Sequence, residues 1–130
     1  MYDIRYEITG YYELLNLHKA LLEAKFHQNP DNKLVSGSPF IAKICNDIVD
    51  LLQEYDYAHK GKDIWKEWRK ISNQDYYKKR IIEKIVDYEG WSELERNTKK
   101  DILLNYLSPF QCDENEIDDL IIEVDKELST

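Results

Sequence analysis

Residues 38–61 read SPFIAKICNDIVDLLQEYDYAHKG, and this stretch carries the most complete helix signature in the chain. Ser38 is a favourable N-cap, and Pro39 suits the first helical position, where its missing N–H breaks no hydrogen bond. Gly61 suits the left-handed position that follows a helix. Apolar residues recur between them at three- and four-residue spacing, as on one face of an amphipathic helix: Ile41, Ile44, Cys45, Ile48, Leu52 and Tyr55. The stretch therefore predicts one long helix with a buried face.

The same two signals, the spacing of apolar residues and the residues that cap or end a helix, predict helices on both sides of this stretch. The expected segments are 9–28, 63–71, 72–90, 92–108 and 113–128. Their expected N-terminal caps are Thr9, Ser72 and two capping boxes, Ser92 with Glu95 and Asp113 with Glu116. All four glycines and all three prolines fall at the boundaries of these segments. We expect an all-α fold, a compact bundle of five to six amphipathic helices forming a single domain over residues 1–130.

The first residues follow a different period. Tyr2, Ile4, Tyr6 and Ile8 alternate with Asp3, Arg5 and Glu7, which is the period of a strand with one buried side. A lone strand needs a partner, and Leu34-Val35 is the one short candidate nearby. The pattern predicts either a half-buried strand or an extended arm.

Composition excludes several classes of protein. With 42% hydrophobic and 34% charged residues among 130, the chain is globular, and its surface is well solvated. The charged N-terminal residues are not those of a signal peptide, and no run of about 18 apolar residues predicts a membrane span. We expect a cytoplasmic protein whose two cysteines, Cys45 in an apolar stripe and Cys112 in a connection, form no disulfide.

The charge is unevenly distributed along the chain. Residues 60–84 hold nine basic and four acidic groups, a net +5, so the total of −8 leaves −13 elsewhere. Residues 113–127 alone hold eight acids and one lysine. We expect the acidic last helix to lie near the basic middle segment. The acidic balance disfavours nucleic acid and anionic membranes as partners and favours a basic protein.

No pattern of catalytic or ligand-binding residues stands out. The glycines lie at the boundaries of the predicted helices, and neither a phosphate-binding nor a dinucleotide-binding glycine motif occurs. The three histidines, His18, His27 and His59, are dispersed, and Glu23-His27 and Asp56-His59 fit a charged helical surface better than a di-iron site. We therefore expect no enzyme activity, no metal and no cofactor.

One segment supports an alternative function. Trp65, Trp68, Tyr76 and Tyr77 interleave with lysines and arginines, and such a mixture can stack bases and hold phosphates. A nucleic-acid-binding helical protein that uses residues 60–84 is thus one hypothesis. We favour the other interpretation, in which the aromatic rings belong to the core and the cations pair with the acidic last helix.

Acidic residues and tyrosines are abundant in this chain and have no catalytic or ligand-binding role assigned above, and both are typical of protein recognition. The chain resembles, in size, charge and aromatic content, the small acidic immunity proteins with which bacteria neutralise their own toxins. That resemblance implies an inhibitor of a basic bacterial toxin. Our leading hypothesis is a non-enzymatic protein-binding module, and a third alternative is an enzyme or ligand carrier with an unrecognised pocket. The candidate partner-binding residues are Tyr11, Tyr57, Tyr76, Asp113, Glu114, Glu116, Asp118 and Asp119.

Overall fold

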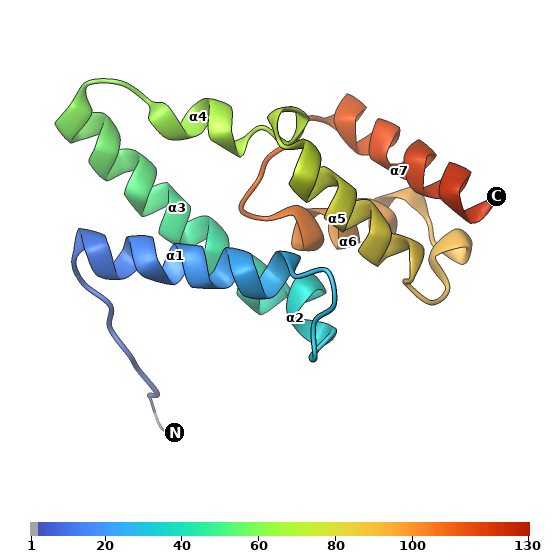
Figure 1. The fold of residues 1–130 in the computed structure, drawn as a ribbon, viewed down its shortest axis with the longest axis horizontal. Helices are drawn as coiled ribbons and strands as arrows, with labels where there is room; N and C mark the ends of the chain where they lie inside the picture. The colour runs from blue at the N-terminus through green and yellow to red at the C-terminus, as the bar shows by residue number, and fades with distance from the viewer. Residues whose placement is uncertain (1–2) are drawn as a thin grey trace.

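The computed structural model describes residues 3–130, and its regular structure is helical (Figure 1). Helix accounts for 73% of the chain, and residues 3–130 contain no strand or sheet. The α-helices are α1 (Tyr11–Phe26), α2 (Leu34–Gly37), α3 (Pro39–Lys60), α4 (Ile64–Arg69), α5 (Asp75–Val86), α6 (Arg96–Leu107) and α7 (Glu114–Leu128). Two 3-10 turns, η1 (Ile71–Asn73) and η2 (Trp91–Glu93), precede α5 and α6. The all-α prediction is confirmed. None of the helices described is both long and apolar enough to cross a bilayer.

Helix α3 begins and ends as its sequence predicts. The Ser38 side chain accepts a hydrogen bond from the Ile41 N–H, and Gly61 takes the left-handed conformation at φ 74°. Cys45 and Ile48 are buried as expected. The buried face is centred further round the helix than predicted, because α1, α4 and α6 all pack against α3. As a result Ile44 and Tyr55, both placed in the buried stripe by sequence, are exposed.

Three of the predicted helix starts are wrong. Gly10, not Thr9, is the N-cap of α1, and its positive φ of 99° turns the chain before the helix. Ser72 and Ser92 lie inside the 3-10 turns η1 and η2, so α5 and α6 begin three or four residues later without side-chain caps. Of the two predicted capping boxes, only the one before α7 is confirmed. Asp113 accepts from the Glu116 N–H at 2.8 Å, and the Asp113 N–H donates to the Glu116 carboxylate at 3.0 Å.

Two clusters of apolar side chains hold the helices together. The larger cluster joins α5, α6 and α7 to the end of α1, to both 3-10 turns and to the connection after α6. Its buried members are Phe26, Ile71, Ile81, Ile85, Trp91, Leu103, Leu107, Phe110, Ile117, Leu120 and Val124. The smaller cluster joins α3 to α1 and α4 through Ile48, Val49, Leu52 and Trp65. Trp68 packs against both clusters and links the two groups of helices. Both cysteines carry free thiols, Cys45 buried and Cys112 half-buried, as the sequence predicted.

Residues 3–9 form an extended arm before α1 (Figure 1). Of the two predicted states, the arm is observed and the strand is not, since the expected strand partner, Leu34-Val35, belongs to α2. Ile4 is 93% exposed and Tyr6 is 89% exposed, so neither packs against the helices. Tyr2 lies outside the described residues.

Candidate functional site

The acidic candidates on α7 are largely occupied by contacts within the chain. Asp113 and Glu116 complete the capping box. Glu114 forms ion pairs with Arg96 at 2.8 Å and with Lys100, and hydrogen bonds from those two cations lower the pKa of its carboxyl group. Asp118 pairs with the same Arg96 at 2.7 Å.

Of the five acidic candidates, only Asp119 is exposed and makes neither an ion pair nor a capping hydrogen bond in residues 3–130. The other four carboxylates stabilise the start of α7 or fasten α7 to α6. The last helix is therefore less available to a partner than its sequence indicates.

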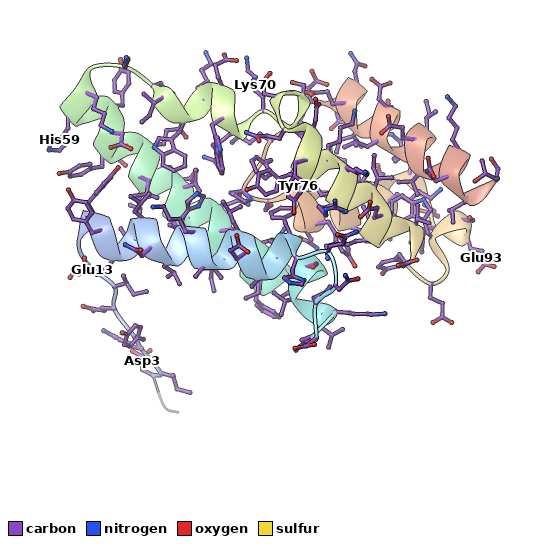
Figure 2. The ribbon with its side chains drawn as sticks, in the orientation of Figure 1. Asp3, Glu13, His59, Lys70, Tyr76 and Glu93 are labelled. Atoms are coloured by element: carbon purple, nitrogen blue, oxygen red, sulfur yellow. The ribbon has the colours of Figure 1, made fainter. Side chains whose placement is uncertain are left out.

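The three tyrosine candidates do not share a surface. Tyr57, 60% exposed, lies near the end of α3, and Tyr76, 58% exposed, lies at the start of α5 beneath the Arg80 guanidinium (Figure 2). The prediction of Tyr11 as a partner-binding residue is not supported, because Tyr11 is half-buried and donates its hydroxyl to Asp56 at 3.2 Å. Its neighbour Tyr12 is the exposed one.

The basic middle segment is mostly paired or buried. α5 packs against α7, and Lys78 lies 3.8 Å from Glu123, which confirms that the acidic last helix approaches this segment. Arg69 is buried, and Arg80 pairs with Glu83. The aromatic residues of the segment belong largely to the core. Trp65 is buried and donates its indole N–H to Asp56 at 2.7 Å, while Trp68 packs on Phe110 at 4.8 Å between ring centroids. The structure thus supplies no exposed stacking platform from these two tryptophans, and the nucleic-acid hypothesis loses its main support.

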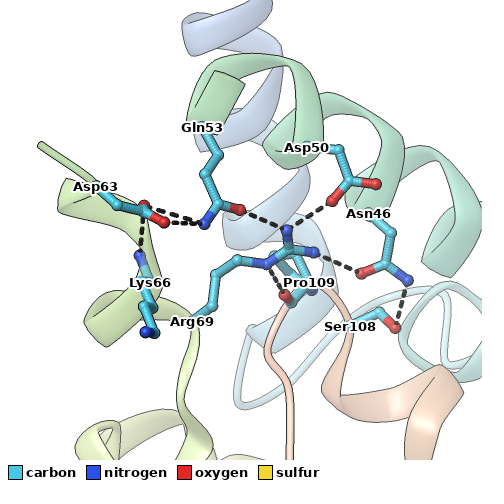
Figure 3. A network of polar contacts seen from close by, with 8 residues as sticks. All are labelled: Asn46, Asp50, Gln53, Asp63, Lys66, Arg69, Ser108 and Pro109. Atoms are coloured by element: carbon cyan, nitrogen blue, oxygen red, sulfur yellow. Dashed lines mark hydrogen bonds and ion pairs between the residues drawn. The ribbon is translucent and has the colours of Figure 1, made fainter. Parts of the chain in front are cut away.

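Arg69 is the centre of a buried polar network that the sequence analysis missed (Figure 3). Its guanidinium donates to the Pro109 carbonyl at 3.0 Å, to Asp50 at 2.6 Å and to Gln53 at 3.0 Å. Asn46, Asp50 and Gln53 follow one another at helical spacing on α3, and this polar row was the available signal. The network fastens α4 and the connection after α6 to α3, so we assign it a structural role.

A groove of about 610 Å³ runs between α5 and α7. Ile82 and Val86, one helical turn apart, form an apolar floor, and Lys78 and Lys79 lie toward the start of α5. The acidic residues toward the end of α5 and along α7 are Glu83, Asp87, Glu123 and Glu127. Asp75, the first residue of α5, also lines the groove, so the groove combines an apolar floor with an end of mixed charge near the lysines and an acidic opposite end.

The 3-10 turn η2 carries a further acidic residue near the end of α7. The Trp91 indole donates to Asp125 at 3.3 Å, which holds η2 against the end of α7. Glu93 on η2 therefore lies at the same end of the molecule (Figure 2). Asp87, Glu93 and Glu127 are exposed, and none of them forms an ion pair in the part of the chain that the structure describes. We call these three residues the acidic end.

The histidines lie apart from one another. His18 is buried, with the rings of Trp65 and Trp68 at 5.2 and 5.3 Å, and burial lowers its pKa to about 4. His27 is on the surface after α1, and His59 stacks on Tyr55 near the end of α3 (Figure 2). No three metal-binding side chains gather anywhere in residues 3–130.

Comparison with protein-family models, with curated proteins and with solved structures finds no match for this chain. The class of protein is therefore defined by its own structure: an all-α bundle with an extended N-terminal arm and a charged groove between α5 and α7.

Proposed function

We propose that the protein is a non-enzymatic protein-binding module whose partner docks in the groove between α5 and α7. The observation that carries this proposal is the acidic end: Asp87 and Glu127, exposed and without ion pairs, line the groove with the apolar side chains of Ile82 and Val86, and Glu93 lies at the same end of the molecule. An apolar centre with a charged rim is the usual arrangement of a protein-binding surface. Among the other acidic side chains of α7, Asp119 is unpaired but does not line the groove, and the rest contact α5 or α6 or cap the helix, so they contribute less.

The chemistry of the groove defines the partner that fits it. Lysine or arginine side chains would meet Asp87, Glu93 and Glu127, and an apolar side chain would contact the floor. Opposite charge speeds association, and added salt screens that effect. A basic toxin neutralised by a small acidic inhibitor has this chemistry, and we propose an immunity-type inhibitor as the finer form of the function.

The test begins with affinity capture from the native cells, followed by binding measurements on the purified partner. A double variant, Asp87→Lys with Glu127→Lys, reverses two charges of the acidic end. Its control, Asp31→Lys with Glu54→Lys, makes the same change in total charge at exposed residues outside the groove. We expect the association rate to fall about tenfold or more in the first variant and much less in the control.

Two results would contradict the proposal. Equal effects of the two double variants would mean that the partner responds to total charge and does not dock at the groove. Capture of nucleic acid with no protein, in a salt-dependent manner, would instead support the alternative function.

A further inference from the structure

The extended arm presents apolar side chains that its own chain leaves uncovered. Ile4 and Tyr6 are almost fully exposed, so covering both would remove a large apolar area from water and would be favourable. Their alternation with Asp3, Arg5 and Glu7 places the apolar side chains on one side of the arm and the charges on the other. The arm therefore has the form of a strand-like segment with one side made for burial.

A second apolar surface lies along the seam between α1 and α3. Phe40, Ile44, Leu51 and Tyr55 project from one side of α3 and are all exposed. Three half-buried leucines of α1 pack against the core beside this row: Leu14, Leu17 and Leu21. The ring of Tyr11 lies 4.9 Å from that of Tyr55, which marks the end of the seam nearest the arm. We call this surface the α1/α3 seam.

The arm as a whole is about as long as the exposed row on α3. Residues 3–9, fully extended, span about 23 Å at ~3.3 Å per residue. The row from Phe40 to Tyr55 spans about 22 Å at a rise of ~1.5 Å per residue. The charge pattern also fits, because Lys43 and Asp47 on this part of α3 neutralise each other at 2.6 Å. The apolar side chains of the arm, from Ile4 to Ile8, span about 13 Å at ~3.3 Å per residue, so they can cover more than half of the exposed row without leaving a buried charge unpaired.

The direction of the arm favours binding to the α1/α3 seam of a second copy of the chain over binding to its own seam. Gly10, at φ 99°, sends the arm away from the helices and from the seam of its own chain (Figure 1). A Cβ at Gly10 would clash with the Glu13 carboxylate, so another residue there would require both the backbone and Glu13 to change. We propose that two copies associate about a two-fold axis, with residues 3–9 of each lying along the α1/α3 seam of the other.

A two-fold exchange of this kind closes on itself, because the arm of each copy meets the seam of its partner and both apolar surfaces are covered at once. The charges of the arm stay on its outer side, in water. The contact is apolar while each copy carries a net charge of −8, so added salt should strengthen the dimer by screening repulsion. This salt dependence is opposite to the one expected for a basic partner at the acidic end.

The first test measures mass in solution by sedimentation equilibrium over a range of concentrations. We expect a dimer for the full chain and a rise of roughly tenfold to a hundredfold in its Kd for Ile4→Asp, in the arm, and for Leu51→Glu, in the seam. Ile122→Asp, at an exposed apolar residue of α7 outside both surfaces, is the control and should leave the Kd unchanged. Circular dichroism verifies that each variant keeps its helices.

A second test locates the arm by disulfide trapping. A Tyr6→Cys chain mixed with a Leu51→Cys chain should give a cross-linked pair under oxidation. Neither native thiol competes well, because Cys45 is buried and the pKa of Cys112 is raised to about 12 by burial. A chain carrying both substitutions that forms only an internal disulfide at low concentration would place the arm on its own seam and overturn the proposal. A monomer at all concentrations with no cross-link in either experiment would overturn it as well.

Discussion

His18 makes the stability of the fold depend on acid in a way that one substitution can isolate. The side chain is only 6% exposed and lies against the edges of two tryptophan rings, so the charged imidazolium is disfavoured and its pKa falls from 6.5 to about 4. Above pH 6.5 the imidazole is neutral in both the folded and the unfolded chain, and it imposes no acid penalty.

As the pH falls below 6.5, the unfolded chain binds a proton that the folded chain does not. The free energy of unfolding therefore decreases until the pH reaches about 4, where the folded state is protonated too. At about 1.4 kcal/mol for each pKa unit, the full loss is about 3–4 kcal/mol. Most of this loss should be present at pH 4.5.

The assay is urea unfolding followed by circular dichroism at pH 7.5 and pH 4.5. We expect His18→Phe, which keeps an aromatic ring between the two tryptophans, to lose about 2 kcal/mol less than the native chain between these pH values. His59→Phe, at an exposed histidine, is the control and should lose as much as the native chain. An unchanged pH dependence in His18→Phe, or a His18 pKa near 6.5 by NMR titration, would refute this account.

Three further predictions concern stability and use the same unfolding assay at pH 7.5. Arg69→Met removes the buried donor to the Pro109 carbonyl and should lower the free energy of unfolding by about 3 kcal/mol. Asp50 is the exposed partner in the Arg69–Asp50 ion pair, so Asp50→Asn should lower the free energy of unfolding by less than about 1 kcal/mol. Ile48→Asp places an unpaired charge in the smaller core and should cost about 3–5 kcal/mol, and a stable variant would mean that α3 is wrongly placed. Asp113→Ala removes a capping box and should cost about 1 kcal/mol, and no loss would mean that the cap is not formed in solution.

The helices could be predicted where their signals are local. Ser38, Pro39 and Gly61 act through hydrogen bonds and dihedral angles of neighbouring residues, so α3 has the predicted ends. The failures at Ser72 and Ser92 have a tertiary cause. The backbone beside η1 is held by the Ile71 N–H bonded to the Gln111 carbonyl, and η2 is held by burial of Trp91. These long-range contacts favour a tight turn over an earlier helix start.

The candidate site depended more on tertiary structure than the helices did. The acids of α7 appeared available because the sequence does not show that Arg96 and Lys100 of α6 lie beside Glu114. The groove was missed for the same reason. Ile82 and Val86 continue an apolar face of α5, but only the position of α7 turns that face into a groove floor.

The two proposed contacts can form on one molecule at the same time, because they use different groups of helices. The α1/α3 seam belongs to the helices around the smaller core, and the groove belongs to α5 and α7 around the larger one (Figure 1). Exchange of arms would therefore leave both grooves of a dimer accessible, and two partners could bind per dimer. Because salt should weaken the partner contact and strengthen the dimer contact, a series of ionic strengths separates them. A complex that keeps its dimer but loses its partner as salt rises is the expected result, and loss of both together would mean that one surface serves both contacts.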